Sequence, residues 1–430
     1  MKAVRIGICL LITFAVLAHG VVEVWSASIF EMGSVLLLVI WSCAVLLRRE
    51  EKIQLSPLLW PLEGLTLLGI IQLAFGWTVQ PYLTRSELLQ VFALLIIFFL
   101  ASQAFRKKEE LRGLVWFLLF LCFAVSLFGV IQFLTSNGKL YWFRPLGGGG
   151  DPFGPYVNRN HFAGFVELIV PTGLALLVFR GLRRDQAALA GLFAIIPIGA
   201  LVFSATRGGI AVLIFEVSLL ATLMWLHRAG RVKAGAAAIV LLAAVALVAW
   251  LGVGKVLGRL RELRPSELPF SRRISMAHDT WKVFVDHPLA GTGLGTLVAV
   301  YPSYATFYDG KTIDHAHNDY LELLADAGIA GGLCGLAFLF LLFHGSLRNL
   351  RLPQSTFSLS LHAGGLVATT GILVHSLFDF NLHLPANAML FLLQAHLASL
   401  PPFDSGGGHR KLSETRGESS IDNRSLASPY

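Results

Sequence analysis

Runs of about 20 apolar residues, the length that crosses the hydrocarbon of a bilayer, recur along this chain from its first residues to residue 400. Each such run predicts a membrane-spanning helix. Charged residues make up only 14% of the 430 residues, whereas a soluble domain contains about 25%. We therefore expect an all-α polytopic membrane protein, and a soluble globular protein with a single anchor is excluded.

The apolar runs predict about twelve transmembrane helices. We expect residues 1–403 to form a transmembrane helical domain, in which 254–318 is the main loop outside the membrane. Residues 404–430 are rich in glycine, serine and charge, which predicts a disordered tail. The predicted spans are 6–22, 28–47, 55–75, 88–105, 114–134, 162–179, 187–203, 209–226, 234–253, 321–343, 359–377 and 384–400.

Lysine and arginine gather in alternate connections between these spans. Connections rich in lysine and arginine remain on the cytoplasmic side of a membrane. Both termini lie on the same side as these connections and are therefore predicted to be cytoplasmic. Residues 144–161, the neighbourhood of Arg207 and the loop 254–318 then face the opposite side. The first run begins like a signal peptide but lacks a convincing cleavage site, which favours a retained first span.

The polar stretch 315–328, HAHNDYLELLADAG, runs directly into a predicted span. Asp319 and Glu322 stand three residues apart, which is typical of a helix N-terminus of the capping-box kind. His317 would lie just outside the first turn, near the positive end of the helix dipole. That position disfavours the imidazolium and keeps a neutral base available near pH 7. A merely structural, capping His317 is the alternative.

Two other outer segments carry polar groups. The glycine- and proline-rich loop 147–161 is a connector in which Asn158, Asn160 and His161 are candidate sugar or phosphate contacts. The neighbouring Arg159 is a further candidate for substrate binding. Arg207 stands between two spans among small residues. Its guanidinium could snorkel to the lipid headgroups or bind an anion, and the residues alone leave both interpretations open.

Residues 271–286 of the main loop predict an amphipathic helix at the membrane interface. Apolar residues from Ile274 to Val285 recur at helical spacing, so this face should lie on lipid or on the bundle. Arg272 and Arg273 could be a solvated face, but guanidinium groups also match phosphate geometry. The following glycines, 291–295, predict a tight turn; without a preceding strand they do not indicate a nucleotide site.

A metal site is not predicted. His315 and His317 lie two positions apart, a spacing that does not share a helix face, and no third histidine lies nearby in sequence. The groups near the outer end of the eleventh span, His375, Asp379 and His383, are interpreted as polar caps or supporting groups.

Two arginines and an imidazole on the outer side suit transfer from a lipid-linked diphosphate donor. Cationic groups would neutralise the departing diphosphate, and a base would take the proton of an acceptor hydroxyl. Such a donor carries its own energy, in accord with the absence of a nucleotide-phosphate motif on the cytoplasmic side.

Over residues 158–330, and in its number of spans, the chain resembles the bacterial O-antigen ligases and the O-antigen and exopolysaccharide polymerases. The resemblance rests on four motifs in order: Asn160-His161-Phe-Ala-Gly, Ser204-x-x-Arg207-Gly-Gly, Arg273 followed by Asp286-His-Pro-Leu-x-Gly-x-Gly, and His317-Asn-Asp-Tyr-Leu-x-Leu-Leu-Ala-x-x-Gly. It implies a GT-C-like glycosyltransferase of the inner membrane that uses undecaprenyl-diphosphate-linked glycans in the periplasm.

The resemblance also implies roles for single residues. Arg207 and Arg273 would bind the donor diphosphate, and His317 would be the base. Partners would be the undecaprenyl-diphosphate-linked oligo- or polysaccharide, a glycan or lipid A core acceptor and membrane lipids, with no nucleic acid; no metal or other cofactor is implied. The candidate substrate-binding residues are Arg272, Asn318, Asn160, His161 and Arg159.

Three other functions remain open at this point. A polymerase would differ from a ligase only in using a lipid-linked acceptor. A transporter or flippase of lipid-linked sugars fits twelve spans, but should concentrate ionisable groups at mid-membrane; here the basic chemistry lies in outer loops. A non-catalytic assembly partner would tolerate changes at all three candidate residues.

Overall fold

The computed structural model describes residues 1–47, 53–146, 151–227, 270–308, 310 and 312–403. Across these ranges the chain forms α-helices and no β-strand beyond two isolated bridges. This confirms the predicted all-α class. The predicted span 234–253, the first part of the loop 254–318 and the tail 404–430 lie outside the described residues.

Eleven of the twelve predicted spans coincide with helices, α1 to α8 and α13 to α15. Eight of these helices are long and apolar enough to cross a membrane, which makes the chain a multi-pass membrane protein. The eight are α2 (Val24–Leu47), α4 (Pro81–Ala104), α5 (Lys108–Thr135), α6 (Arg159–Val178), α7 (Arg184–Phe203), α8 (Arg207–Leu226), α13 (Asp319–Arg351) and α14 (Thr356–His375). Three shorter helices, α1 (Lys2–Leu17), α3 (Leu59–Ala74) and α15 (Pro385–Ser399), occupy the remaining matched spans.

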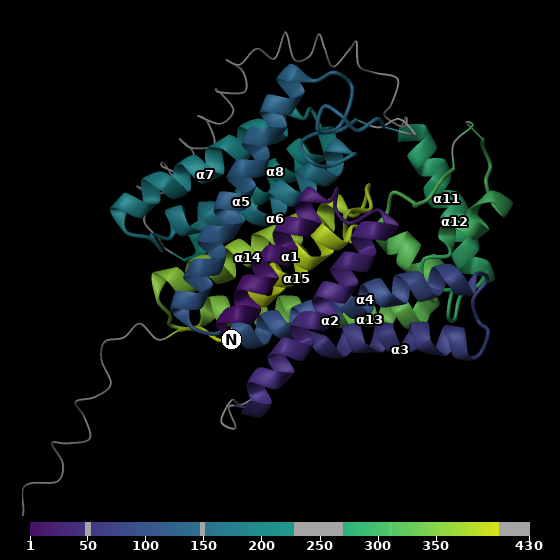
Figure 1. Cartoon of the computed structure of the whole chain (residues 1–430), viewed down its shortest axis with the longest axis horizontal. Helices are drawn as coiled ribbons and strands as arrows, with labels where there is room; N and C mark the ends of the chain where they lie inside the picture. The colour runs from purple at the N-terminus through teal and green to yellow at the C-terminus, as the bar shows by residue number, and fades with distance from the viewer. Residues whose placement is uncertain (48–52, 147–150, 228–269, 309, 311, 404–430) are drawn as a thin grey trace, which may run out of the picture.

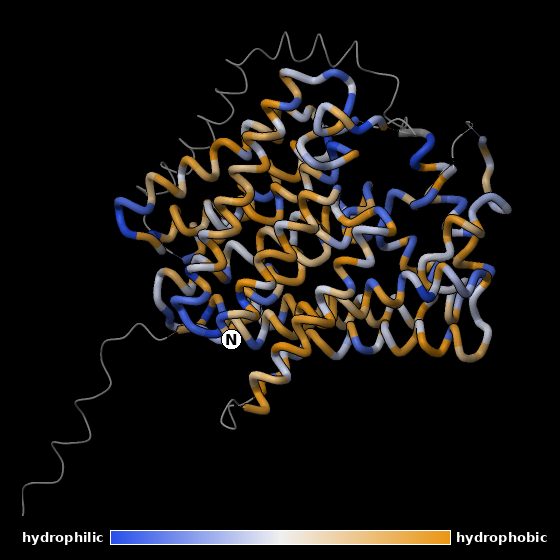
Figure 2. Tube along the Cα trace, in the orientation of Figure 1, coloured by the Kyte–Doolittle hydropathy of each residue, from blue (hydrophilic) through white to orange (hydrophobic). Residues whose placement is uncertain are grey.

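Helices α6, α14 and α15 form the centre of the bundle (Figure 1). Nearly every residue of these helices is buried, whereas α2 keeps most of its apolar surface exposed, as a lipid-facing helix does. Polar residues inside the bundle bond to one another: the Thr172 hydroxyl donates to Gln394 Oε1 at 2.9 Å. In Figure 2 hydrophobic residues follow the helices and hydrophilic ones gather in the connections.

The bundle has two ends that can be told apart by their contacts. At one end Arg5 pairs with Glu110, and the His396 ring bonds to the Phe105 carbonyl. At the other, the Ala386 amide donates to the Gly20 carbonyl. Because α1 begins and α15 ends at the first of these, the first and last described residues lie at the same end of the bundle.

The amphipathic helix is α11 (Phe270–Asp286), followed by the short α12 (Leu297–Val300) and a 3-10 turn, η1 (Tyr301–Ser303). Met276 and Val283 are buried in a small core that includes Tyr301 and Ala325 of α13. The predicted apolar stripe points away from this core: Ile274, Trp281 and Val285 are each about half exposed. The helix thus presents one face to the bundle and an apolar face outward, in accord with a place at the membrane interface.

The glycine-rich turn after α11 packs directly on a kink in α13. Gly328 breaks the helix with φ +61°, and Gly291 has φ +70°. A Cβ atom on Gly291 would lie 2.2 Å from the Asp326 carbonyl carbon, and one on Gly328 would lie 2.5 Å from that of Leu289. Glycine is therefore required at both positions because the two backbones touch. The predicted tight turn is confirmed, and its role is packing.

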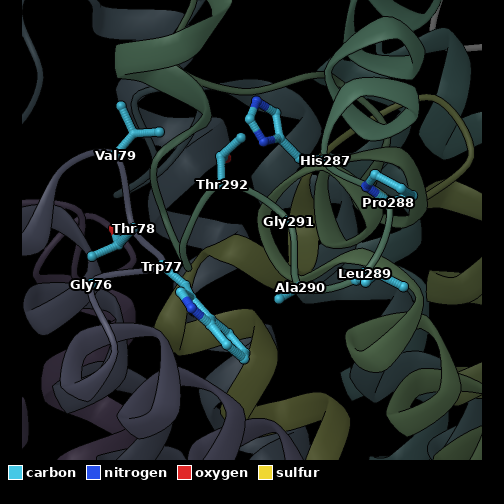
Figure 3. Close-up of a pocket in the computed structure, with 10 residues that line it drawn as sticks. All are labelled: Gly76, Trp77, Thr78, Val79, His287, Pro288, Leu289, Ala290, Gly291 and Thr292. Atoms are coloured by element: carbon cyan, nitrogen blue, oxygen red, sulfur yellow. The ribbon is translucent and has the colours of Figure 1, made fainter.

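Beside this turn lies an open groove of about 450 Å³, shown in Figure 3. Its walls are the connection 76–79 and the turn 287–292, which are joined where the Val79 amide donates to the Thr292 carbonyl at 2.9 Å. Trp77 and Leu289 are exposed at this groove. None of the predicted site residues lines it.

Candidate active site

The segment between α14 and α15 joins several of the predicted site residues. Its centre is Asp379, which is fully buried. The Asn160 side chain, at the start of α6, donates to Asp379 Oδ2 at 2.6 Å, and accepts a hydrogen bond from the Thr206 hydroxyl at 2.7 Å. Thr206 is also the N-cap of α8. One carboxylate thus ties together the beginnings of α6 and α8.

Two imidazoles approach the other oxygen of Asp379. His317 Nδ1 lies 3.5 Å and His161 Nε2 lies 3.8 Å from Asp379 Oδ1. Burial raises the pKa of this carboxyl group, but the two nearby imidazoles outweigh it and hold the pKa well below its ordinary value. Asp379 therefore stays ionised and can orient either ring through its Nδ1 or Nε2 side.

Phe380 separates this group from a second set of polar residues. The rings of His161 and His317 meet Phe380 edge to face, with centroids 4.7 and 4.9 Å away. The His315 ring stacks on the same phenyl group at 4.2 Å. Three histidines from two segments are thus positioned by one aromatic side chain.

His317 immediately precedes the N-cap of α13. Its backbone has φ +50°, a conformation that costs a non-glycine residue free energy and is concentrated at functional sites. The helix begins one residue earlier than the capping box predicts: Asn318, not Asp319, is the N-cap, and its Oδ1 accepts from Tyr320 and Leu321 amides. Glu322 does not cap the helix; it accepts from the Ala316 amide instead.

The three candidate arginines differ in their surroundings. Arg273 Nη1 donates to the Phe378 carbonyl at 2.6 Å, which brings α11 to the α14–α15 connection. Arg207 is exposed at the first position of α8, and its neighbour Gly208 packs on Phe378. Arg272 lies instead over the Phe307 ring, 5.6 Å from its centroid.

Two further candidates have structural partners. Both ends of the Asn318 amide are engaged, since its Nδ2 also donates to the Leu377 carbonyl at 2.9 Å. Arg159 lies 3.5 Å from Asp151. Their predicted contact with substrate stays a prediction.

A second polar cluster lies on the other side of Phe380. His315 Nδ1 lies 2.7 Å from Glu322 Oε1, and His383 Nδ1 lies 2.6 Å from Asp319 Oδ1. Burial lowers the pKa of His383, but the charges of Glu322 and Asp319 outweigh it and the pKa lies well above its ordinary value; that of His315 is raised in the same way by Glu322. Sequence spacing gave no sign of this cluster because His383 is distant along the chain.

Buried acids also lie within the bundle. Glu167 of α6 pairs with His375 of α14 at 2.8 Å, and Glu216 of α8 is buried nearby without a hydrogen-bond partner. His375 Nε2 would lie 3.2 Å from a Cβ atom on Gly208, so this pair adjoins the start of α8. The Glu167–His375 pair therefore lies close to the site around Asp379.

With this geometry, the molecule is defined as a helical multi-pass membrane protein whose polar site forms at one end of the bundle. The O-antigen ligase family model matches residues 192–336. This range contains Arg207, Arg273 and His317 and ends before Asp379. The match confirms the family resemblance over that part of the chain. No curated protein matches the chain.

Proposed function

We propose that this protein is an inner-membrane glycosyltransferase of the O-antigen ligase type. It would transfer a glycan from an undecaprenyl-diphosphate-linked donor to an acceptor hydroxyl on the periplasmic side. The observation that carries the proposal is the convergence of His317, Arg273 and the start of α8 on the connection 376–380. Sites of this composition serve proton removal beside a strongly anionic leaving group.

His317 is the proposed base. With Nδ1 directed at Asp379, its Nε2 is left for the acceptor. The acceptor hydroxyl gives its proton to Nε2 while its oxygen bonds to the anomeric carbon of the donor glycan. The bond from that carbon to the diphosphate oxygen breaks, and undecaprenyl diphosphate leaves with the electron pair. Asp379 stabilises the imidazolium that forms, as a buried carboxylate beside a catalytic histidine does.

Arg207 and Arg273 are the proposed diphosphate ligands. Arg207 is exposed and stands at the N-terminus of α8, where the helix dipole adds attraction for an anion. Arg273 already donates to one carbonyl through Nη1, and its Nε is buried without a partner. Such a donor is available to a phosphate oxygen.

The periplasmic placement of the site rests on the distribution of positive charge, which predicts cytoplasmic termini. The described ends of the chain lie at the end of the bundle opposite Asp379, in accord with that prediction. A polymerase that extends a lipid-linked acceptor is the second candidate, because ligase and polymerase need the same donor chemistry.

The test is transfer from a purified lipid-linked donor by the purified chain. His317→Ala and Arg207→Ala should abolish transfer while expression and membrane insertion stay normal. His278→Ala and Arg183→Ala are matched controls, since these side chains are 62% and 77% exposed away from Asp379. Transfer retained by both site variants would overturn the mechanism.

A deletion strain distinguishes ligase from polymerase. Free lipid-linked polymer should accumulate when a ligase is lost, and single lipid-linked repeats when a polymerase is lost. A normal glycan profile would contradict both activities and favour a transporter or an assembly partner.

A further inference from the structure

We propose that His315, Glu322 and His383 form a binding site for a divalent transition-metal ion of the zinc type, separate from the groups that transfer the glycan. One ligand atom from each residue lies within 4.8 Å of the other two. Two imidazoles and one carboxylate are a donor set that zinc and its first-row neighbours prefer. The cluster combines a loop, α13 and the turn η2 (Asn381–His383).

The spacing of the donor atoms fits a small ion. A tetrahedral site with bonds of about 2.0–2.1 Å has ligand atoms about 3.3–3.5 Å apart. His383 Nε2 lies 3.4 Å from Glu322 Oε1, while His315 Nδ1 lies 2.7 Å from the same oxygen. An ion would therefore need His315 to move back from Glu322 by less than about an ångström.

The surrounding groups hold the proposed ligands as metal sites require. Asp319 accepts a hydrogen bond from His383 Nδ1. This bond orients the ring so that His383 Nε2 points toward Glu322. A carboxylate behind a ligating imidazole is the usual support for zinc ligands. Asp319 is itself fixed by the Ser376 hydroxyl at 2.6 Å, and Glu322 Oε2 by the Ala316 amide at 2.8 Å.

The local charge also favours a cation. Asp326 is 3% exposed, and its Oδ1 has no hydrogen-bond partner. Asp326 and Glu87 both interact electrostatically with Glu322 and His383. Four carboxyl groups, with Asp319 and Glu322, therefore surround two imidazoles in a largely buried space. A divalent ion would add two positive charges among these carboxyl groups while bonding the two imidazoles and Glu322 directly.

The proposed ion has a structural role. It would fix the loop that carries His317 to the α14–α15 connection that carries Asp379, without touching the reacting atoms. The His315 and His383 side chains are 28% and 20% exposed, so an ion can enter from the aqueous side.

The first experiment measures metal content. The full chain, purified without a polyhistidine tag and without chelator, is dialysed against Zn²⁺ and then against metal-free buffer. We expect about one equivalent of zinc per chain by elemental analysis. Replacement by Co²⁺ should give the visible absorption of a low-coordinate nitrogen–oxygen site, and chelation should lower the midpoint of thermal unfolding.

Variants assign the site. Glu322→Gln keeps the shape and hydrogen-bonding reach of the side chain but removes the charged ligand, so zinc should be lost even in a folded protein. Asp319→Asn should weaken binding by roughly 10- to 100-fold, the effect of removing a supporting carboxylate. His278→Ala is the matched histidine control and should retain zinc.

The outcome is independent of the proposed transfer reaction. His317→Ala, which should be inactive, is expected to retain the full equivalent of zinc. A wild-type chain that binds no Zn²⁺ or Co²⁺ would overturn the site. So would zinc binding that Glu322→Gln and His383→Ala leave unchanged, because the ion would then be held elsewhere.

Discussion

Two histidine clusters lie on either side of Phe380. The Asp379 cluster comprises Asp379, Asn160, His161 and His317, and the Glu322 cluster comprises Glu322, Asp319, His315 and His383. Both contain imidazoles and carboxylates, but the distances between these groups differ. In the Asp379 cluster the imidazoles lie 3.5 and 3.8 Å from the carboxylate, and Asn160 takes the shorter bond of 2.6 Å. In the Glu322 cluster imidazole and carboxylate meet at 2.6–2.7 Å. A loosely held ring is available to exchange a proton with a substrate, whereas tightly held rings suit a fixed structural site.

The largest effect expected from this difference is on catalysis. His317→Ala should abolish measurable transfer, since a positioned base contributes roughly 10²–10⁴-fold, while His315→Ala should lower it far less and reduce thermal stability instead. The measurement is the initial rate with lipid-linked donor, together with the unfolding midpoint. Equal losses of rate in the two variants would remove the distinction between the clusters.

Phe380 supports both clusters, so its removal should affect both. Phe380→Ala is expected to destabilise the protein by about 3–5 kcal/mol, the usual cost of truncating a buried phenylalanine. Thermal unfolding in detergent measures this, with Leu377→Ala as the control because Leu377 is 56% exposed. A shift no larger than that of the control would show that the rings do not depend on Phe380.

Asp379 should act through His317. Asp379→Asn keeps the size and the hydrogen-bonding reach of the side chain but removes its charge. We therefore expect kcat to fall by roughly 10²-fold with little change in KM for the donor. Asp379→Glu should recover part of the rate, which a purely structural role would not predict. Asp185→Asn is the control, since that side chain is 70% exposed. An unchanged kcat would exclude Asp379 from the mechanism.

The smallest effect is expected at the glycine turn, which packs on α13 next to the Glu322 cluster. Gly291→Ala places a Cβ atom against the Asp326 backbone at positive φ, so a loss of about 1–3 kcal/mol is expected. Gly199→Ala is the control, because nothing lies within 4 Å of its Cβ position. Equal unfolding midpoints would mean that the turn moves away from α13 without cost.

Much of the fold could be predicted from the sequence because hydropathy is a local signal. The spans, the amphipathic α11 and the glycine turn all depend on residues close together in the chain. The apolar face predicted for α11 exists, but it is not the face that packs on the bundle. Met276 and Val283 are buried against the bundle, whereas Trp281 of the predicted face points outward. Periodicity identifies an apolar face but does not decide whether protein or lipid covers it.

The candidate site was less predictable. His317, Arg207 and Arg273 stand in motifs that can be found along the chain, and the fold brings their segments together. Asp379 and His383 were interpreted as polar caps because their partners lie more than 60 residues away, at His317 and Asp319. A carboxylate that contacts Asn160 and His161 at the start of α6 and His317 before α13 leaves no local pattern.

The close packing of Gly291 on Asp326 and of Gly328 on Leu289 joins two parts of the site. Since the two backbones meet there with no side chain between them, the turn that follows α11 and the first half of α13 pack as one unit. Arg273 is part of α11 and His317 directly precedes α13, so both adjoin that unit. Arg207 belongs to α8, which packs on α6 and α14. The two arginines therefore belong to differently packed parts of the bundle, so a shift of α8 against α11 and α13 would change the distance between them.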